Sequence, residues 1–86
     1  MRRIDREWQE DRIDRTGVSN LAQAMRYKLK EKRLEGRYGW ADQDVCSTGM
    51  LRRMLRSHSK KCDMVDIANF AMMIHNREHC MKPRER

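Results

Sequence analysis

The sequence predicts an all-α fold: a small bundle of about three helices preceded by a charged N-terminal arm. Apolar residues recur at helical spacing in three segments, and no segment alternates apolar and polar residues as a β-strand does. The chain has 86 residues, of which 38% are charged and 38% hydrophobic. Because a chain of this size buries only about 60% of its unfolded surface, we expect it to gain stability by self-association, as a homodimer or a larger oligomer.

The charge pattern divides the chain into three regions: a charged arm over 1–16, a helical domain over 17–80 and a basic, disordered tail over 81–86. The arm alternates arginines with acids, and its only large apolar residues are Ile4, Trp8 and Ile13. It is therefore either frayed or docked on a partner through Ile4 and Trp8. Gly17 is expected to end the arm, because glycine interrupts helical segments.

The first helix of the domain is expected to begin at an N-cap, Asn20 or Ser19, and to stop at Gly36. Its apolar stripe consists of Leu21, Met25 and Leu29, and its outer face carries Arg26, Lys28, Lys30, Lys32 and Arg33. That basic face, with Tyr27 and Tyr38 nearby, is either a solvated surface or a nucleic-acid contact. Nucleic acid is the less favoured partner, because Glu31 and Glu35 interrupt the face and no DNA-binding motif is present.

A second helix is expected over 49–61 with Ser47 or Thr48 as its N-cap, and a third over about 64–78 with Asp63 as its N-cap. The apolar stripe of the second helix consists of Met50, Leu51, Met54, Leu55 and His58, and the opposite side carries Arg52, Arg53, Arg56 and Lys60. The loop between the first two helices contains Tyr38 and Trp40, which we expect to pack back on the helices. The third helix is apolar nearly all round, so we expect it to be central and to contact a second copy.

The net charge of +7 favours anionic partners, namely nucleotides, nucleic acid or an acidic protein surface. The N-terminus lacks the apolar core of a signal peptide, and no run approaches the ~18–20 apolar residues of a membrane span. Three scattered cysteines suit a reducing compartment. We therefore expect a cytoplasmic protein that does not bind a membrane.

The apolar segment DMVDIANFAMMIHN contains three polar residues spaced three positions apart: Asp63, Asp66 and Asn69. One hypothesis is structural: Asp63 caps the helix, Asp66 pairs with an arginine of the second helix, and Asn69 satisfies a backbone group. The other is that Asp66 and Asn69 line a cleft that binds a nucleotide. The residues alone leave both open.

Two motifs, Gly-x-x-Gly-Trp at 36–40 and Asp-x-x-Asp-Ile-Ala-Asn-Phe at 63–70, lie within a segment, roughly 28–77, that resembles short phage and prophage proteins. Those proteins are described as dATP/dGTP pyrophosphohydrolase domain proteins and are similar to the MazG-like all-α nucleotide pyrophosphohydrolases. The resemblance implies a site in which four acids from two helices hold Mg²⁺ or Mn²⁺. It also implies a phage-encoded protein in a host bacterial cytoplasm.

The resemblance assigns Asp63 and Asp66 to one half of that metal site, but the other half is missing. No Asp or Glu occurs over 45–62, and Arg53, Arg56 and Ser57 stand where the resemblance requires glutamates. Cys62 and Met64 are further departures. Arginines beside Asp66 would compete with a divalent ion and still bind phosphate, since guanidinium offers paired donors.

The favoured hypothesis is therefore a nucleotide- or anion-binding protein with a degenerate hydrolase site, which sequesters a nucleotide as a counter-defence. Its expected binding residues are Arg37, Trp40, Arg53, Arg56, His58, Asp66 and Asn69. One alternative is an active dNTP pyrophosphohydrolase with Mg²⁺ or Mn²⁺ on Asp42, Asp44, Asp63 and Asp66. Another is an inhibitor of a host protein complex that uses the basic faces, Trp8 and Trp40.

Near the end of the third helix, His75 and His79 at i,i+4 precede Cys80, a spacing that also occurs in zinc sites. The simpler interpretation is a pair of exposed histidines that favour the helix dipole. His58, on the apolar stripe of the second helix, is either a core histidine or a functional base.

Overall fold

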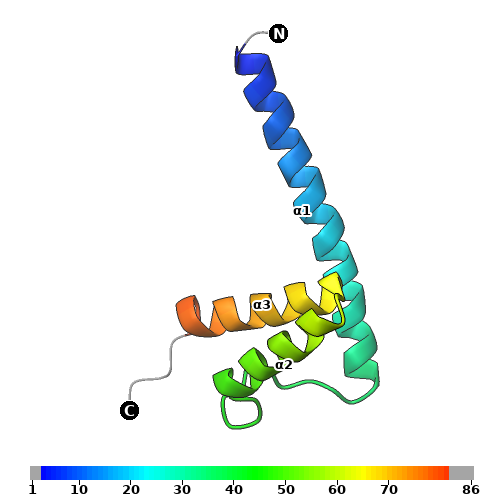
Figure 1. Ribbon diagram of the computed structural model, residues 1–86, viewed down its shortest axis with the longest axis vertical. Coiled ribbons are helices and arrows are strands. Elements are labelled where there is room, and N and C mark those ends of the chain that lie inside the picture. The colour runs from blue at the N-terminus through cyan, green and yellow to red at the C-terminus, as the bar shows by residue number, and fades with distance from the viewer. Residues whose placement is uncertain (1–2, 82–86) are drawn as a thin grey trace.

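A computed structural model describes residues 3–81 and confirms the all-α prediction (Figure 1). It contains α1 (Arg3–Leu34), α2 (Thr48–Lys60) and α3 (Met64–His79), with no strand in this range. Apart from Met81, the tail expected over 81–86 lies outside the described residues. The docking expected of Ile4 concerns a side chain that is not described either.

α1 is one continuous helix of 32 residues, so the predicted break at Gly17 is wrong, as are the predicted caps at Ser19 and Asn20. A single glycine costs a helix only about 1 kcal/mol relative to alanine, which the neighbouring turns can offset. One such turn holds an Asp11–Arg15 ion pair of 2.9 Å. The charged arm is therefore the first half of a rod about 48 Å long, at 1.5 Å per residue.

The other helix ends follow the sequence prediction. Gly36 has a φ of +86°, and Arg37 N–H donates to the Lys32 carbonyl over 2.8 Å, which forms a glycine-terminated helix end. The Ser47 hydroxyl accepts from Met50 N–H at the start of α2. The Asp63 carboxylate accepts from Asp66 N–H at the start of α3, so both predicted N-caps are confirmed.

α3 packs against both other helices, which confirms its expected central place within the chain (Figure 1). The core is small, and Leu51 is its one completely buried side chain among residues 5–81. Around it lie Cys46, Met73 and Ile74, with Leu29, Trp40, Met54, Leu55, Phe70 and Met72 partly buried against them. Of the two loop aromatics, Trp40 packs on this core as expected, whereas Tyr38 remains 74% exposed.

The N-terminal half of α1 projects well beyond α2 and α3 (Figure 1). The molecule measures 53 × 34 × 24 Å, and its radius of gyration is 16.5 Å. A compact domain of this length has a radius of gyration of about 12 Å. Every residue over 5–20 is exposed, including Trp8, Ile13 and Val18. None of the helices over residues 3–81 has the length and apolar character needed to cross a membrane.

Candidate functional site

A cleft of about 560 Å³ lies between the C-terminal half of α1, the following loop, α2 and α3. Its size falls within the roughly 300–1,000 Å³ of small-molecule sites. Most of its wall is apolar, with Leu29, Val45, Met50, Leu51, Met54 and Met73. The aromatic rings of Tyr38, Trp40 and Phe70 line it as well. Such a wall offers a flat, uncharged group both shape and stacking surface.

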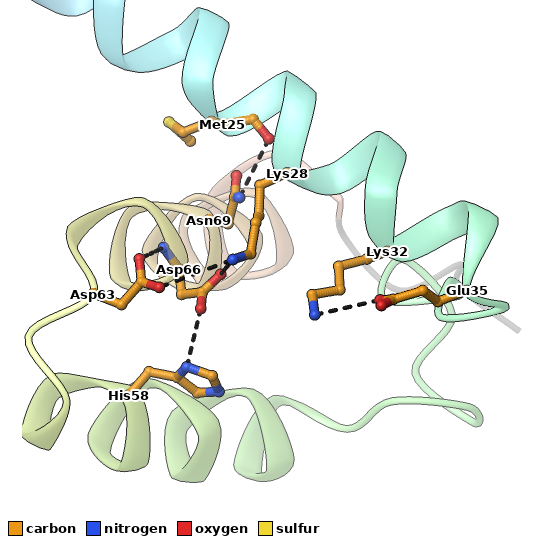
Figure 2. Close-up of polar contacts among 8 residues, drawn as sticks. All are labelled: Met25, Lys28, Lys32, Glu35, His58, Asp63, Asp66 and Asn69. Atoms are coloured by element: carbon orange, nitrogen blue, oxygen red, sulfur yellow. Dashed lines mark hydrogen bonds and ion pairs between the residues drawn. The ribbon is translucent and has the colours of Figure 1, made fainter.

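Polar groups on one wall form a small network around Asp66 (Figure 2). Lys28 Nζ, on α1, lies 3.8 Å from one Asp66 oxygen and 3.9 Å from Asp63. His58 Nδ1, on α2, lies 3.3 Å from the other Asp66 oxygen, although the two atoms are not aligned for a hydrogen bond. The network thus connects side chains of α1, α2 and α3 near the N-terminus of α3.

Asn69 is one turn further along α3 and is only 4% exposed. Its Nδ2 donates to the Met25 carbonyl on α1 over 3.3 Å (Figure 2), which confirms that it satisfies a backbone group. Its Oδ1 is buried without a hydrogen-bond partner. A buried acceptor without a donor costs about 1–3 kcal/mol.

Three cations line the cleft from the end of α1 and the loop: Lys32, Arg33 and Arg37. Lys32 extends from α1 into the space between α1 and α2, beside the Asp66–His58 pair, where its Nζ lies 3.4 Å from Glu35 (Figure 2). Arg33 and Arg37 are exposed, and neither pairs with a carboxylate within residues 3–81. The cleft therefore has an apolar interior and a cationic side, on which Arg33 and Arg37 can bind an anion.

The loop that supplies Tyr38 and Trp40 is held from behind by a buried arginine. Arg77 of α3 is only 9% exposed and donates to the Trp40 carbonyl and, over 2.6 Å, to Gln43. Gly39 has a φ of +99°, and a Cβ there would lie 3.0 Å from a Val45 methyl. The loop conformation thus depends on a glycine at this position as well as on Arg77.

The structure brings together five of the seven residues expected to bind a nucleotide: Arg37, Trp40, His58, Asp66 and Asn69 all line the cleft. Arg53 and Arg56 do not line it but lie exposed on α2. The expected pairing of Asp66 with an arginine is wrong, because its partners are Lys28 and His58. Arg53 and Arg56 lie on the side of α2 opposite its apolar stripe, so they cannot reach Asp66.

Sequence reasoning missed Lys28, Lys32 and Arg33 as residues of this site. Lys28 and Lys32 stand three and seven positions after Met25, on the flank of the α1 stripe, which was a usable signal. Long lysine side chains bury their stems along such a flank and keep the charge near water. They were not predicted as site residues because the basic face that contains them was interpreted as a solvated surface.

Metal ligation has little support from the geometry. Within the described part of the chain, no three His, Cys, Asp or Glu side chains gather in a way suited to a metal ion. The proposed acid set with Asp42 and Asp44 and the zinc set with Cys80 are therefore not assembled. His75 and His79 are both exposed, with ring centroids 5.0 Å apart.

The fold affects the ionisation of Asp63. The N–H of Asp66, which donates to its carboxylate, holds the pKa of Asp63 below its ordinary value, and the charge of Lys28 adds to the effect. The carboxylate is thereby kept ionised as a helix cap. In this arrangement Asp63 supports the start of α3 rather than lining the cleft.

Comparison with known proteins gives no match: no family model, no curated protein and no solved structure is significantly similar to the chain.

Proposed function

We propose that the chain binds a phosphate-bearing ligand of nucleotide size in this cleft and holds it without metal-dependent hydrolysis. The observation that carries the proposal is the combination, in one cavity, of an aromatic, apolar interior with three cations at its side. Arginine and lysine side chains suit phosphate oxygens, and aromatic rings suit a nucleobase. Asp66, Asn69 and His58 line the same cavity and are the polar side chains proposed for the base or the sugar.

Binding without turnover follows from the same geometry. Cleavage of a phosphoanhydride requires charge neutralisation and a positioned water, which the resembled enzymes obtain from a cluster of acids and metal. Here Asp66 is engaged by Lys28 and His58 instead. The proposed role is therefore sequestration of a nucleotide, which is also the form of counter-defence that the resemblance to phage proteins suggests.

The test is a thermal-shift and calorimetric panel of the full chain against dNTPs, NTPs, cyclic nucleotides and inorganic pyrophosphate, each in EDTA and in Mn²⁺. A ligand present at about 100 times its Kd raises the unfolding free energy by about 2.7 kcal/mol. We expect a shift with at least one nucleotide in EDTA and no further shift with Mn²⁺. A shift that requires Mn²⁺, with release of pyrophosphate, would support the active enzyme instead.

Arg37→Ala and Arg53→Ala form a matched pair, because each removes one exposed arginine and only Arg37 lines the cleft. A hydrogen bond to a charged group contributes roughly 1.5–3 kcal/mol, so Arg37→Ala should weaken nucleotide binding about 10- to 100-fold. Arg53→Ala should leave the affinity unchanged. Equal losses from both variants would indicate nonspecific attraction to a basic surface and would contradict the proposed site.

A further inference from the structure

α3 has a second face that the rest of the described chain leaves largely uncovered. Its stripe of Met64, Ala68, Ala71 and His75 lies opposite the side that packs on α2. Met64 is 64% exposed, Ala71 and His75 are exposed as well, and Ala68 is half-buried. A helix that is apolar nearly all round is typically buried on all sides, so this face is suited to another protein surface.

The projecting half of α1 forms the second wall of the same notch. Val18 and Leu21 precede Met25 and Lys28 by seven residues, two helical turns, and therefore face the side on which α3 lies. The same side continues toward the N-terminus with three acids. Asp11 and Asp14 lie seven residues before Val18 and Leu21, and Glu7 lies seven residues before Asp14. The inner side of the arm is thus apolar next to α3 and carries carboxylates toward its free end, of which Asp11 is paired with Arg15.

The solvent-accessible surface area of the chain is larger than expected for a compact monomer, which favours a bound partner. The chain exposes 7645 Å², whereas a compact monomer of 10.4 kDa exposes about 5,400 Å². The difference of roughly 2,200 Å² exceeds the ~800 Å² that each partner buries in an interface of standard size. The chain therefore has the spare surface of a subunit in a stable assembly.

We infer that this notch, formed by the arm of α1 and the uncovered face of α3, is filled by a second copy of the chain in an antiparallel α3–α3 contact. The residues of the α3 stripe are separated by four, three and four positions, so their spacing is the same from either end of the helix. An antiparallel two-fold pair therefore sets Ala68 opposite Ala71 of the other copy, and Met64 opposite His75. The two alanines at the centre allow the helices to approach closely.

Charge favours a second copy over a nucleic acid as the occupant. The arm over 1–16 contains five acids and five arginines, a net charge of zero. Residues 17–81 contain twelve lysines and arginines and seven acids, a net charge of +5. A neutral arm offers a phosphate backbone no net attraction, whereas its carboxylates are attracted to the basic body of another copy.

The first test is the mass of the full chain in solution, by light scattering and sedimentation over a range of concentrations. We expect a dimer that Ala71→Glu dissociates, with Kd raised about a hundredfold or more, because the pair would bury two unpaired carboxylates. Ser57→Glu, at an exposed position of α2, should leave the dimer intact. A monomer at all concentrations, or a dimer that Ala71→Glu leaves unchanged, would overturn the inference.

Cross-linking tests the register without relying on a disruptive variant. Chains with Ala68→Cys and Ala71→Cys, both also carrying Cys62→Ser and Cys80→Ser, are mixed and mildly oxidised. Opposed positions bring Cβ atoms to the roughly 3.5–4.5 Å that a disulfide needs, so a disulfide-linked heterodimer is expected. Ala24→Cys on exposed α1 surface, mixed with Ala71→Cys, should give no such product. Equal cross-linking of both mixtures would contradict the antiparallel contact.

Discussion

At the scale of one residue, the helix cap and the ion pair of Asp63 make the free energy of unfolding depend on pH. Its pKa is lowered in the folded chain, mainly by the Asp66 N–H that donates to it. A group with a lowered folded pKa contributes stability above its unfolded pKa of about 3.9, and that contribution is lost as the pH falls through the folded pKa. The acid-side loss should therefore occur below about pH 4.

Asp63→Asn separates the cap from the charge, because asparagine is an equally good N-cap that does not titrate. We expect this variant to remain folded at pH 7 and to lose less stability than the wild type between about pH 4 and pH 2. Asp63→Ala should lower the unfolding midpoint even at pH 7, since it removes the cap itself. Urea unfolding across this pH range measures both effects; an unchanged acid-side slope in Asp63→Asn would contradict the assignment.

At the scale of one helix, α1 provides the sharpest difference between sequence and structure. Both predicted N-caps that the structure confirms, Ser47 and Asp63, precede segments with a clear apolar pattern. Gly17 instead lies between two segments that each favour a helix, so local signals alone do not decide whether the helix continues. The contacts of Asp66 were out of reach for a related reason: periodicity places His58 on the inner side of α2 but does not locate Lys28 opposite it.

Gly17→Ala tests the continuity of α1. An alanine Cβ at this position has no heavy atom within 4 Å, so the substitution is free of steric cost. Alanine in a helix interior is favoured over glycine by about 0.5–1 kcal/mol. We expect higher helicity by circular dichroism and a higher unfolding midpoint. A loss of helicity would indicate that the chain bends at Gly17 after all.

Arg77→Met tests how α3 holds the loop that lines the cleft. The variant removes the donors to the Trp40 carbonyl and to Gln43 while keeping most of the side-chain volume. We expect the amide hydrogens of Val45 and Cys46, which donate to the Asp42 carbonyl, to exchange about 5- to 30-fold faster, equivalent to 1–2 kcal/mol. Gln43→Ala is the control and should have a smaller effect. Unchanged exchange would mean that core packing alone holds the loop.

At the scale of the whole molecule, the small core and the projecting arm suggest that folding depends on association with a second copy. The described part of the chain has a single completely buried side chain, so a separate monomer retains little hydrophobic stabilisation. If two copies interlock through the notch, folding and association are coupled, and mass action makes the unfolding temperature depend on protein concentration. A rigid, self-sufficient monomer has no such dependence.

Each tenfold rise in concentration adds about 1.4 kcal/mol to the unfolding free energy of a dimer. With an unfolding entropy of about 2.1 cal/mol/K per residue for both chains, Tm should rise by roughly 4 °C for each tenfold step. Scanning calorimetry at three concentrations measures this slope. In Ala71→Glu, Tm should be lower and independent of concentration, because the unfolding unit is then one chain. A flat wild-type series would mean that the exposed α3 face remains uncovered, and the long arm of α1 would then need another explanation.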